Sequence, residues 1–255
     1  MISGARLSKV EGWVNEKPDI TIKKLCNKYQ SYYKVKVSHS MMFRALNSLK
    51  LTRKKKSLFA QEQFRDDVKK KRSRYIEKYQ QVDPNRLIFI DEMGAHLNMI
   101  MDYGRAKSGK RVVMPKPFVR GPKISLIGAI STTKVESAFY GEWATDTNTF
   151  YHFIQHQLCQ KLNKKHIVLL ENVALDKDHR IEDAILSTGA AIDFLPPYSP
   201  EYNPIEMLWS FIKNILRQME ARTMNAFQNA LLYALEKINS AKLKAWYQHA
   251  GYRSI

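Results

Sequence analysis

Residues 87–92 read LIFIDE, four apolar residues that run directly into two acids. A short, unbroken apolar run of this kind is typical of a buried β-strand. The same arrangement recurs at residues 166–171, HIVLLE, where a second apolar run ends in an acid. We therefore predict two buried strands that deliver Asp91 and Glu171 at their carboxyl ends.

Further strand and helix patterns follow along the chain. Strands are also predicted over residues 123–130, 138–140 and 192–195. Helices are predicted over 148–162 and 178–188. Another begins at Asn203-Pro204, with Asn as the N-cap and Pro as the first helical residue. Strands followed by alternating helix and strand predict an α/β fold, a mixed five-stranded sheet flanked by helices.

Three acids stand where this fold can bring them together: Asp91, Glu171 and Glu206. The first two end strands, and Glu206 lies in the first turn of the helix that begins after Asn203. Ligand sites of α/β sheets lie outside the carboxyl ends of strands. Crowded carboxylates repel unless cations lie between them, and hard divalent cations such as Mg²⁺ prefer oxygen ligands. The alternative is structural, because acids often end strands and an acid in a first helical turn offsets the macrodipole.

The charge of the chain is strongly positive and unevenly spread. It has 42 Lys and Arg against 24 Asp and Glu, a net charge of +18. Residues 1–85 hold 21 basic and 8 acidic residues, a net charge of +13, so this third carries most of the excess. Such an excess indicates a polyanionic partner. An anionic membrane is the competing partner, but no apolar anchor accompanies the charge.

The sequence contains no export or membrane signal that we can identify. No apolar run approaches the roughly 18 residues of a membrane span, and the N-terminus has no apolar signal region. We therefore expect a cytoplasmic protein with no membrane partner. The two cysteines, Cys26 and Cys159, are far apart and in no metal-ligand spacing, so we expect reduced, partly buried thiols.

Three short amphipathic helices are predicted at the N-terminus. The first ends at Lys17-Pro18, Thr21 caps the second, and Ser38 caps the third. A short connection between the last two predicts a helix-turn-helix whose third helix enters the major groove of DNA. The predicted DNA-binding residues are Ser38, His39, Ser40, Arg44, Arg53, Lys54, Lys55 and Lys56. The alternative is a plain three-helix bundle with solvated lysines.

The predicted domains are three. A helix-turn-helix domain covers residues 1–57, a basic helical linker covers 58–85, and the α/β domain covers 86–255. The linker is expected to be one polar helix over 59–80, ended by Asp83-Pro84.

From about residue 19 to the end, the chain resembles mariner-type transposases, in particular the bacterial insertion-sequence branch. The longest matching motif is FLPPYSPEYNPIE at 194–206, followed by Trp209. Other matches are Val37-Ser38 with LTRKKK at 51–56, FIDE at 89–92 with Gly94, YGRA at 103–106 and HAGY at 249–252. In addition, 34 residues separate Glu171 from Glu206, the spacing of the second and third acids in these transposases.

The resemblance implies an RNase H-like fold and a catalytic triad of Asp91, Glu171 and Glu206 that binds two Mg²⁺ or Mn²⁺ ions. It implies that water nicks double-stranded DNA at the terminal inverted repeats of an insertion sequence, and that the freed 3′-hydroxyl attacks target DNA. It also implies a homodimer on DNA, associated with the bacterial nucleoid when bound.

The chain departs from the family at its second acid, which is usually Asp and here is Glu171. Glu is one methylene longer, and an error of about 1 Å in an active site can cost on the order of 100-fold in rate. Two alternatives therefore stay open, an active transposase and a catalytically impaired, DNA-binding remnant of one.

Other candidate sites have competing interpretations. Four basic residues surround Gly104 and Gly109: Arg105, Lys107, Lys110 and Arg111. This stretch nearly matches a phosphate-binding P-loop, but Arg111 replaces the hydroxyl that holds Mg²⁺, so we expect a DNA-backbone contact or a solvated turn.

Two further groups remain. His152 and His156 have the spacing of a zinc pair on a helix but no obvious third ligand, which favours a solvated face. The aromatic residues around Glu206 are expected in core or loop packing, unless one stacks on a flipped base. They are Tyr198, Tyr202, Trp209 and Phe211.

Overall fold

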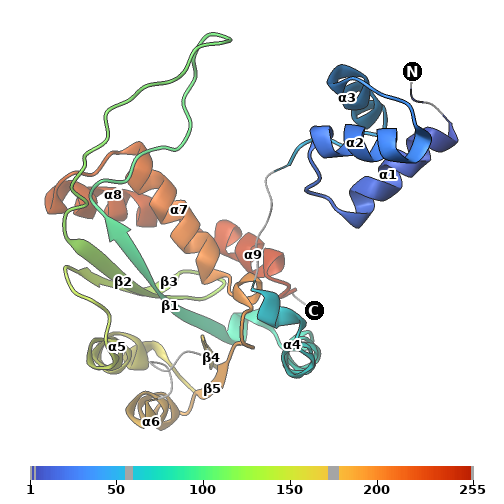
Figure 1. Ribbon diagram of the computed structural model, residues 1–255. Coiled ribbons are helices and arrows are strands. Elements are labelled where there is room, and N and C mark those ends of the chain that lie inside the picture. The colour runs from blue at the N-terminus through green and yellow to red at the C-terminus, as the bar shows by residue number, and fades with distance from the viewer. Residues whose placement is uncertain (1, 3, 55–59, 172–177, 254–255) are drawn as a thin grey trace. The chain divides into compact units, whose positions relative to one another are not determined.

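The computed structural model describes residues 2, 4–54, 60–171 and 178–253 (Figure 1). The chain forms two compact units, residues 1–58 and 59–255, each with its own core. None of the described helices is long and apolar enough to cross a membrane. The domain limits predicted at residues 57 and 85 stay predictions.

The first unit consists of three helices, as predicted. They are α1 (Ala5–Glu16), α2 (Ile22–Tyr33) and α3 (His39–Ser48). Their apolar faces meet in a core that includes Val10, Trp13, Leu25, Tyr29, Met42 and Ala45. Both predicted caps are confirmed: Thr21 Oγ1 accepts a hydrogen bond from the Lys24 N–H at 3.3 Å, and Ser38 Oγ accepts one from the Met41 N–H at 3.2 Å.

The second unit contains the predicted mixed five-stranded sheet. Its strands are β1 (Leu87–His96), β2 (Lys123–Ile130), β3 (Val135–Gly141), β4 (Ile167–Leu170) and β5 (Ala191–Phe194). In space the order is β3-β2-β1-β4-β5. β1 pairs antiparallel with β2, and β2 with β3, whereas β4 is parallel to β1 and β5 is parallel to β4.

Helices cover both faces of this sheet (Figure 1). One core lies between the sheet and four helices, α4 (Asp66–Tyr79), α7 (Ile205–Gln218), α8 (Met224–Glu236) and α9 (Ser240–His249). The opposite core contains α5 (Thr147–Phe153), the π-helical turn η3 (Ile154–Leu158) and α6 (His179–Ser187). Alternate side chains of β1 enter each core: Leu87 and Phe89 one, Ile88 and Ile90 the other. A strand buried on both faces explains the unbroken apolar run of residues 87–90.

Short helical turns complete this unit: η1 (Gln61–Phe64), η2 (Pro84–Arg86), η4 (Cys159–Lys161) and η6 (Pro200–Tyr202).

The structure corrects three element predictions. β1 runs to His96 rather than ending at residue 90, because β2 pairs with it as far as Lys123. The helix predicted over 148–162 passes from α5 into a π turn and then a 3₁₀ turn. The polar helix predicted from residue 59 begins at Asp66.

The predicted Asn203 cap is also wrong. The N-cap of α7 is Pro204, and within the described residues the Asn203 side chain has no hydrogen-bond partner. Instead, the backbone carbonyl of Asn203 accepts the Glu206 N–H at 3.2 Å. The backbone carbonyl thus satisfies the first-turn donor that the Asn side chain was expected to bind.

An ion pair joins α4 to the sheet. Asp193 Oδ2 on β5 accepts hydrogen bonds from Lys78 Nζ at 2.7 Å and from Tyr79 Oη at 2.6 Å, and both donors lie on α4. Partial burial raises the pKa of Asp193, but the hydrogen bonds from Lys78 and Tyr79 outweigh it and leave the pKa below its ordinary value. Because α4 is the element through which the first unit is connected to the sheet, this pair anchors the start of the second unit.

We expect Asp193→Asn to lower the free energy of unfolding by about 1–3 kcal/mol near pH 7, measured by urea unfolding. Because the folded pKa lies below the unfolded one, the stabilisation is complete above the unfolded pKa and is lost as the pH falls through the folded value. The difference between wild type and variant should therefore shrink below about pH 4. As a control, Asp183→Asn, at an exposed position of α6, should change stability by less than about 0.5 kcal/mol. If the difference in unfolding free energy between wild type and Asp193→Asn stayed constant down to acid pH, the lowered pKa of Asp193 would be contradicted.

Candidate active site

Asp91 lies on β1, at the centre of the sheet, and is 7% exposed. Both of its carboxylate oxygens have a donor. Oδ1 accepts the Glu92 N–H at 2.7 Å, and Oδ2 accepts the indole Nε1–H of Trp209 at 3.0 Å. The chain therefore fixes both oxygens of this buried carboxyl group.

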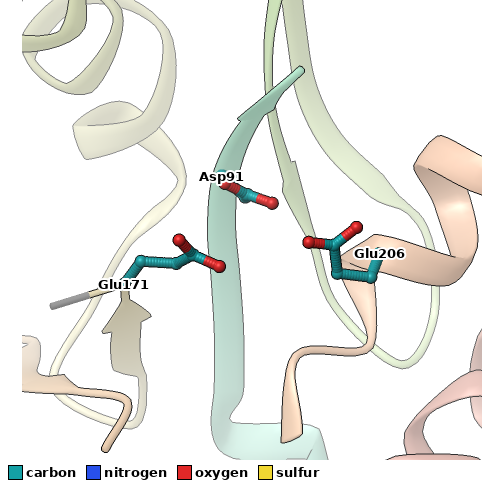
Figure 2. A group of neighbouring side chains, drawn as sticks. All are labelled: Asp91, Glu171 and Glu206. Atoms are coloured by element: carbon teal, nitrogen blue, oxygen red, sulfur yellow. The ribbon is translucent and has the colours of Figure 1, made fainter. Parts of the chain in front are cut away.

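The sheet register brings Glu171 next to Asp91. β4 is parallel to β1 with Phe89 opposite Leu169, and each acid follows two residues later on its own chain segment. Glu206 comes from the first turn of α7. Figure 2 shows the three side chains pointing toward one another, Asp91 from the middle of β1, Glu171 from the end of β4 and Glu206 from the start of α7. The prediction that Asp91 ends its strand is therefore wrong, because β1 continues to His96. One carboxylate oxygen from each lies within 4.8 Å of those of the other two.

Burial and the neighbouring acids disfavour the charged form of Asp91, the most buried of the three acids. Burial raises the pKa of Asp91 well above its ordinary value, and the neighbouring charges of Glu171 and Glu206 raise it further, opposed by the Trp209 hydrogen bond. Glu206 stands at the solvent side, and its pKa is raised by partial burial and then by Glu171. Cations between the oxygens would offset this repulsion.

The loop that leads to Glu206 is held by Arg72 of α4. The Arg72 guanidinium donates to the Tyr198 carbonyl at 3.3 Å, to Ser199 Oγ at 2.6 Å, to Tyr202 Oη at 3.2 Å and to the Glu201 carboxylate. It also lies 4.9 Å from the centre of the Tyr202 ring. In the sequence, Arg72 falls within residues 59–80, which are predicted only as a polar helix. Its partners are more than 120 positions away, so no local pattern could identify it.

The predicted DNA-binding residues of the first unit are exposed where the structure describes them. Ser38, His39 and Ser40 lie at the N-terminal end of α3, and Arg44 lies in the middle of that helix. Arg53 and Lys54 are exposed beyond α3. Lys55 and Lys56 lie outside the described residues.

The second predicted basic group lies in the connection between β1 and β2. Arg105, Lys107, Lys110 and Arg111 are all exposed there. This connection, residues 97–122, is described throughout and contains no helix, whereas a P-loop needs a helix directly after its glycine-rich turn. A nucleotide-binding P-loop is thus absent from this connection, and a contact with the DNA backbone stays a prediction.

The other candidates do not form a metal site. His152 and His156 stack with ring centres 5.5 Å apart. Within the part of the chain that the structure describes, the one group of three or more possible metal ligands is Asp91, Glu171 and Glu206. Cys26 and Cys159 are free, partly buried thiols, as expected.

The aromatic residues around Glu206 differ in burial. Trp209 is buried, Tyr202 and Phe211 are partly buried, and Tyr198 is exposed with a left-handed backbone, φ 56°. Packing therefore accounts for three of the four.

The second unit is an RNase H-like sheet with one acid on β1, one directly after the adjacent parallel strand β4 and a third on α7. The sequence model of the family described as DDE superfamily endonuclease matches residues 86–228. That match covers more than half of the chain and includes all three acids. The chain therefore belongs to the DDE superfamily endonucleases.

Solved structures of the Mos1 transposase have the same fold. The Mos1 strand transfer complex matches with a TM-score of 0.76 and 13% identity, over 96% of this chain and 73% of that one. The mariner Mos1 paired end complex with Mg matches with a TM-score of 0.74 and 12% identity, over 98% and 79%. The paired end complex with Mn matches with a TM-score of 0.74 and 13% identity, over 95% and 74%. No curated protein sequence matches the chain.

We expect Arg72→Lys to lower the free energy of unfolding by about 1–3 kcal/mol, because lysine keeps the charge but cannot bridge several acceptors at once. Amide hydrogen exchange should also become faster in the loop at residues 198–203. Arg74→Lys, on the exposed side of the same helix, is the matched control and should change stability by less than about 0.5 kcal/mol. Equal effects of the two substitutions would show that Arg72 does not hold the loop.

Proposed function

We propose that the chain is a transposase that binds the ends of an insertion sequence and cuts and joins DNA at Asp91, Glu171 and Glu206. The observation that carries the proposal is the convergence of these three carboxylates within 4.8 Å, inside the region matched by the endonuclease family. The mariner-like motif at 194–206, which ends in the third acid, supports the transposase assignment over other nucleases of this fold.

The acids fit divalent cations such as Mg²⁺ or Mn²⁺. All the converging ligand atoms are carboxylate oxygens, the donors that these hard cations prefer. The raised pKa values of Asp91 and Glu206 reflect repulsion that a cation would relieve. Two such ions, when bound, activate the attacking oxygen and stabilise the leaving oxygen of a phosphoryl transfer. The Mos1 complexes with Mg and with Mn are consistent with this choice of cation.

The residues of the site have distinct tasks in this proposal. Asp91, buried and held at both oxygens, is the fixed ligand that faces the other two acids. Glu171 and Glu206 complete the ligand set from either side, and Glu206 faces the solvent from which DNA enters.

The reaction takes place in two displacements. In the first, a water oxygen attacks the scissile phosphorus, the P–O3′ bond breaks, and a 3′-hydroxyl and a 5′-phosphate remain. In the second, that 3′-hydroxyl attacks a phosphodiester of target DNA, giving a new P–O3′ bond and a free 3′-hydroxyl on the target strand.

The first unit would hold double-stranded DNA through α3. Its exposed N-terminal residues can reach base edges, and the basic residues that follow can bind phosphates without reading sequence. The exposed basic residues between β1 and β2 are proposed as a second backbone contact. We further propose a homodimer on paired DNA ends, by analogy with the paired end complexes of Mos1.

A second candidate function rests on Glu171, which stands where related transposases have Asp. The longer side chain reaches the acidic cluster, since one of its oxygens lies within 4.8 Å of those of Asp91 and Glu206. If the extra methylene moves a cation out of line, the protein would bind DNA without cutting it efficiently.

We expect the full chain with Mg²⁺ or Mn²⁺ to nick duplex DNA that carries the terminal repeats of its element. Asp91→Asn should lower the nicking rate by on the order of 100-fold or more, because it removes the charge of the central ligand. The rates are measured by single-turnover cleavage on a sequencing gel. Wild-type activity that equals that of Asp91→Asn would contradict a catalytic role for the triad.

Glu171→Asp separates the two candidate functions. For an active transposase, the rate of this variant should stay within about 10-fold of wild type, because Asp keeps the carboxylate and its charge at this position. A gain on the order of 100-fold would favour the impaired remnant. Asp183→Asn, in the same unit, is the control for a carboxylate away from the cluster and should leave the rate unchanged.

We expect Arg53→Ala and Lys54→Ala each to weaken DNA binding and to reduce the slope of log affinity against log salt by about 1, if each contacts one phosphate. The affinity is measured by fluorescence anisotropy at several salt concentrations. Lys17→Ala, which removes an equal charge between α1 and α2, is the control. If all three variants reduce the slope equally, the residues after α3 have no specific role in contacting the DNA phosphates.

A further inference from the structure

Trp209 connects the helix of the third acid to the strand of the first. It lies on α7, three residues after Glu206, and is 2% exposed. Its indole Nε1–H donates to Asp91 Oδ2 at 3.0 Å across 118 positions of sequence. A single side chain thus bridges two of the three elements that supply the acids.

Gly128 makes room for this bridge. The sheet register places Gly128 of β2 directly opposite Asp91 of β1. A Cβ at position 128 would lie 2.6 Å from Trp209 Cη2, closer than real carbon contacts allow, and 3.3 Å from Cζ2, which is a tight contact. The indole therefore rests on the bare backbone of β2, and the absence of a side chain there sets how near α7 comes to the sheet.

The chemistry of the indole suits a carboxylate that must bind cations. Its N–H can only donate, so it orients Asp91 without offering a competing ligand or a charge. Asp91 Oδ1 already accepts the Glu92 N–H. With one donor on each oxygen, one acceptor site on each oxygen remains, and the rotation of the carboxylate is fixed.

We propose that Trp209 is a positioning residue of the acidic site: its indole N–H, seated over Gly128, fixes the orientation of Asp91 toward Glu171 and Glu206. This inference rests on the proposed function, in which the three acids bind divalent cations. Donors of this kind orient metal ligands in many proteins, and their loss typically costs about 10- to 100-fold in metal affinity or activity.

The test compares Mn²⁺ binding by the full chain and its variants, measured by water proton relaxation during a Mn²⁺ titration. Trp209→Phe should bind Mn²⁺ at least about 10-fold more weakly than wild type. Replacing Trp209 by benzothienylalanine, which keeps the shape of the ring and lacks the N–H, should weaken binding similarly while keeping the melting temperature. The matched control is Trp246→Phe, a buried tryptophan of the same core that packs against Phe211. It should leave Mn²⁺ affinity unchanged.

Gly128→Ala tests separately whether the close contact between the Trp209 indole and the backbone of β2 matters. It keeps the N–H but should weaken Mn²⁺ binding, because the new methyl group displaces the ring from Asp91. Phe in place of Trp209 lacks Cη2 and Cζ2 of the indole, so adding Gly128→Ala to Trp209→Phe should cost little more. The two substitutions should therefore be non-additive.

The outcomes separate this inference from the proposed function. If Asp91→Asn loses Mn²⁺ binding while the benzothienylalanine variant binds as tightly as wild type, the positioning role of Trp209 is overturned and the metal site stands. If Asp91→Asn binds Mn²⁺ like wild type, the metal site itself is overturned, and the role of Trp209 with it. If Trp209→Phe and Trp246→Phe weakened Mn²⁺ binding equally, Trp209 would have only a packing role.

Discussion

The repulsion among three carboxylates is the constraint on which the second unit depends. One of them, Asp91, is almost fully buried, and its neighbours raise its pKa further. A fold that brings such groups together loses stability unless something compensates their charge. Two hydrogen bonds to Asp91 supply part of that compensation. Cations would supply the rest, which ties the stability of the site to its proposed chemistry.

The architecture sets the geometry of the acids through rigid elements. β1 and β4 are central, parallel neighbours, so their acids emerge side by side. The third acid is brought in by α7, which the indole of Trp209 holds against β2 and the first acid. The loop before α7 is held by Arg72 from α4. Sites built on strands and helices keep their ligands in place more accurately than sites built on loops.

Sequence reasoning could predict the features that depend on local patterns. The strand at residues 87–90 is identified by its unbroken apolar run, and the caps at Thr21 and Ser38 by their residue types. The three candidate acids were found because two of them follow apolar runs and the third lies in the first turn of a helix, and because the motif at 194–206 resembles known transposases. The end of the first strand was not visible in the same way, since Asp91 lies in the middle of β1.

Contacts between distant segments could not be predicted in the same way. β1 extends to His96 only because β2 pairs with it, and the Asn203 cap failed because the backbone carbonyl satisfies the first-turn donor. The partners of Arg72 and of Trp209 lie more than 100 residues away. The length of β1 and the partners of Arg72 and Trp209 depend on long-range contacts, whereas the Asn203 cap depends on a local choice between side chain and backbone carbonyl. Residue type alone specifies neither.

The most direct test of the central claim is a crystal structure of the full chain soaked in Mn²⁺, with anomalous scattering used to locate the ions. The account predicts anomalous density between the carboxylates of Asp91, Glu171 and Glu206. Ordered carboxylates with no density between them at saturating Mn²⁺ would contradict it.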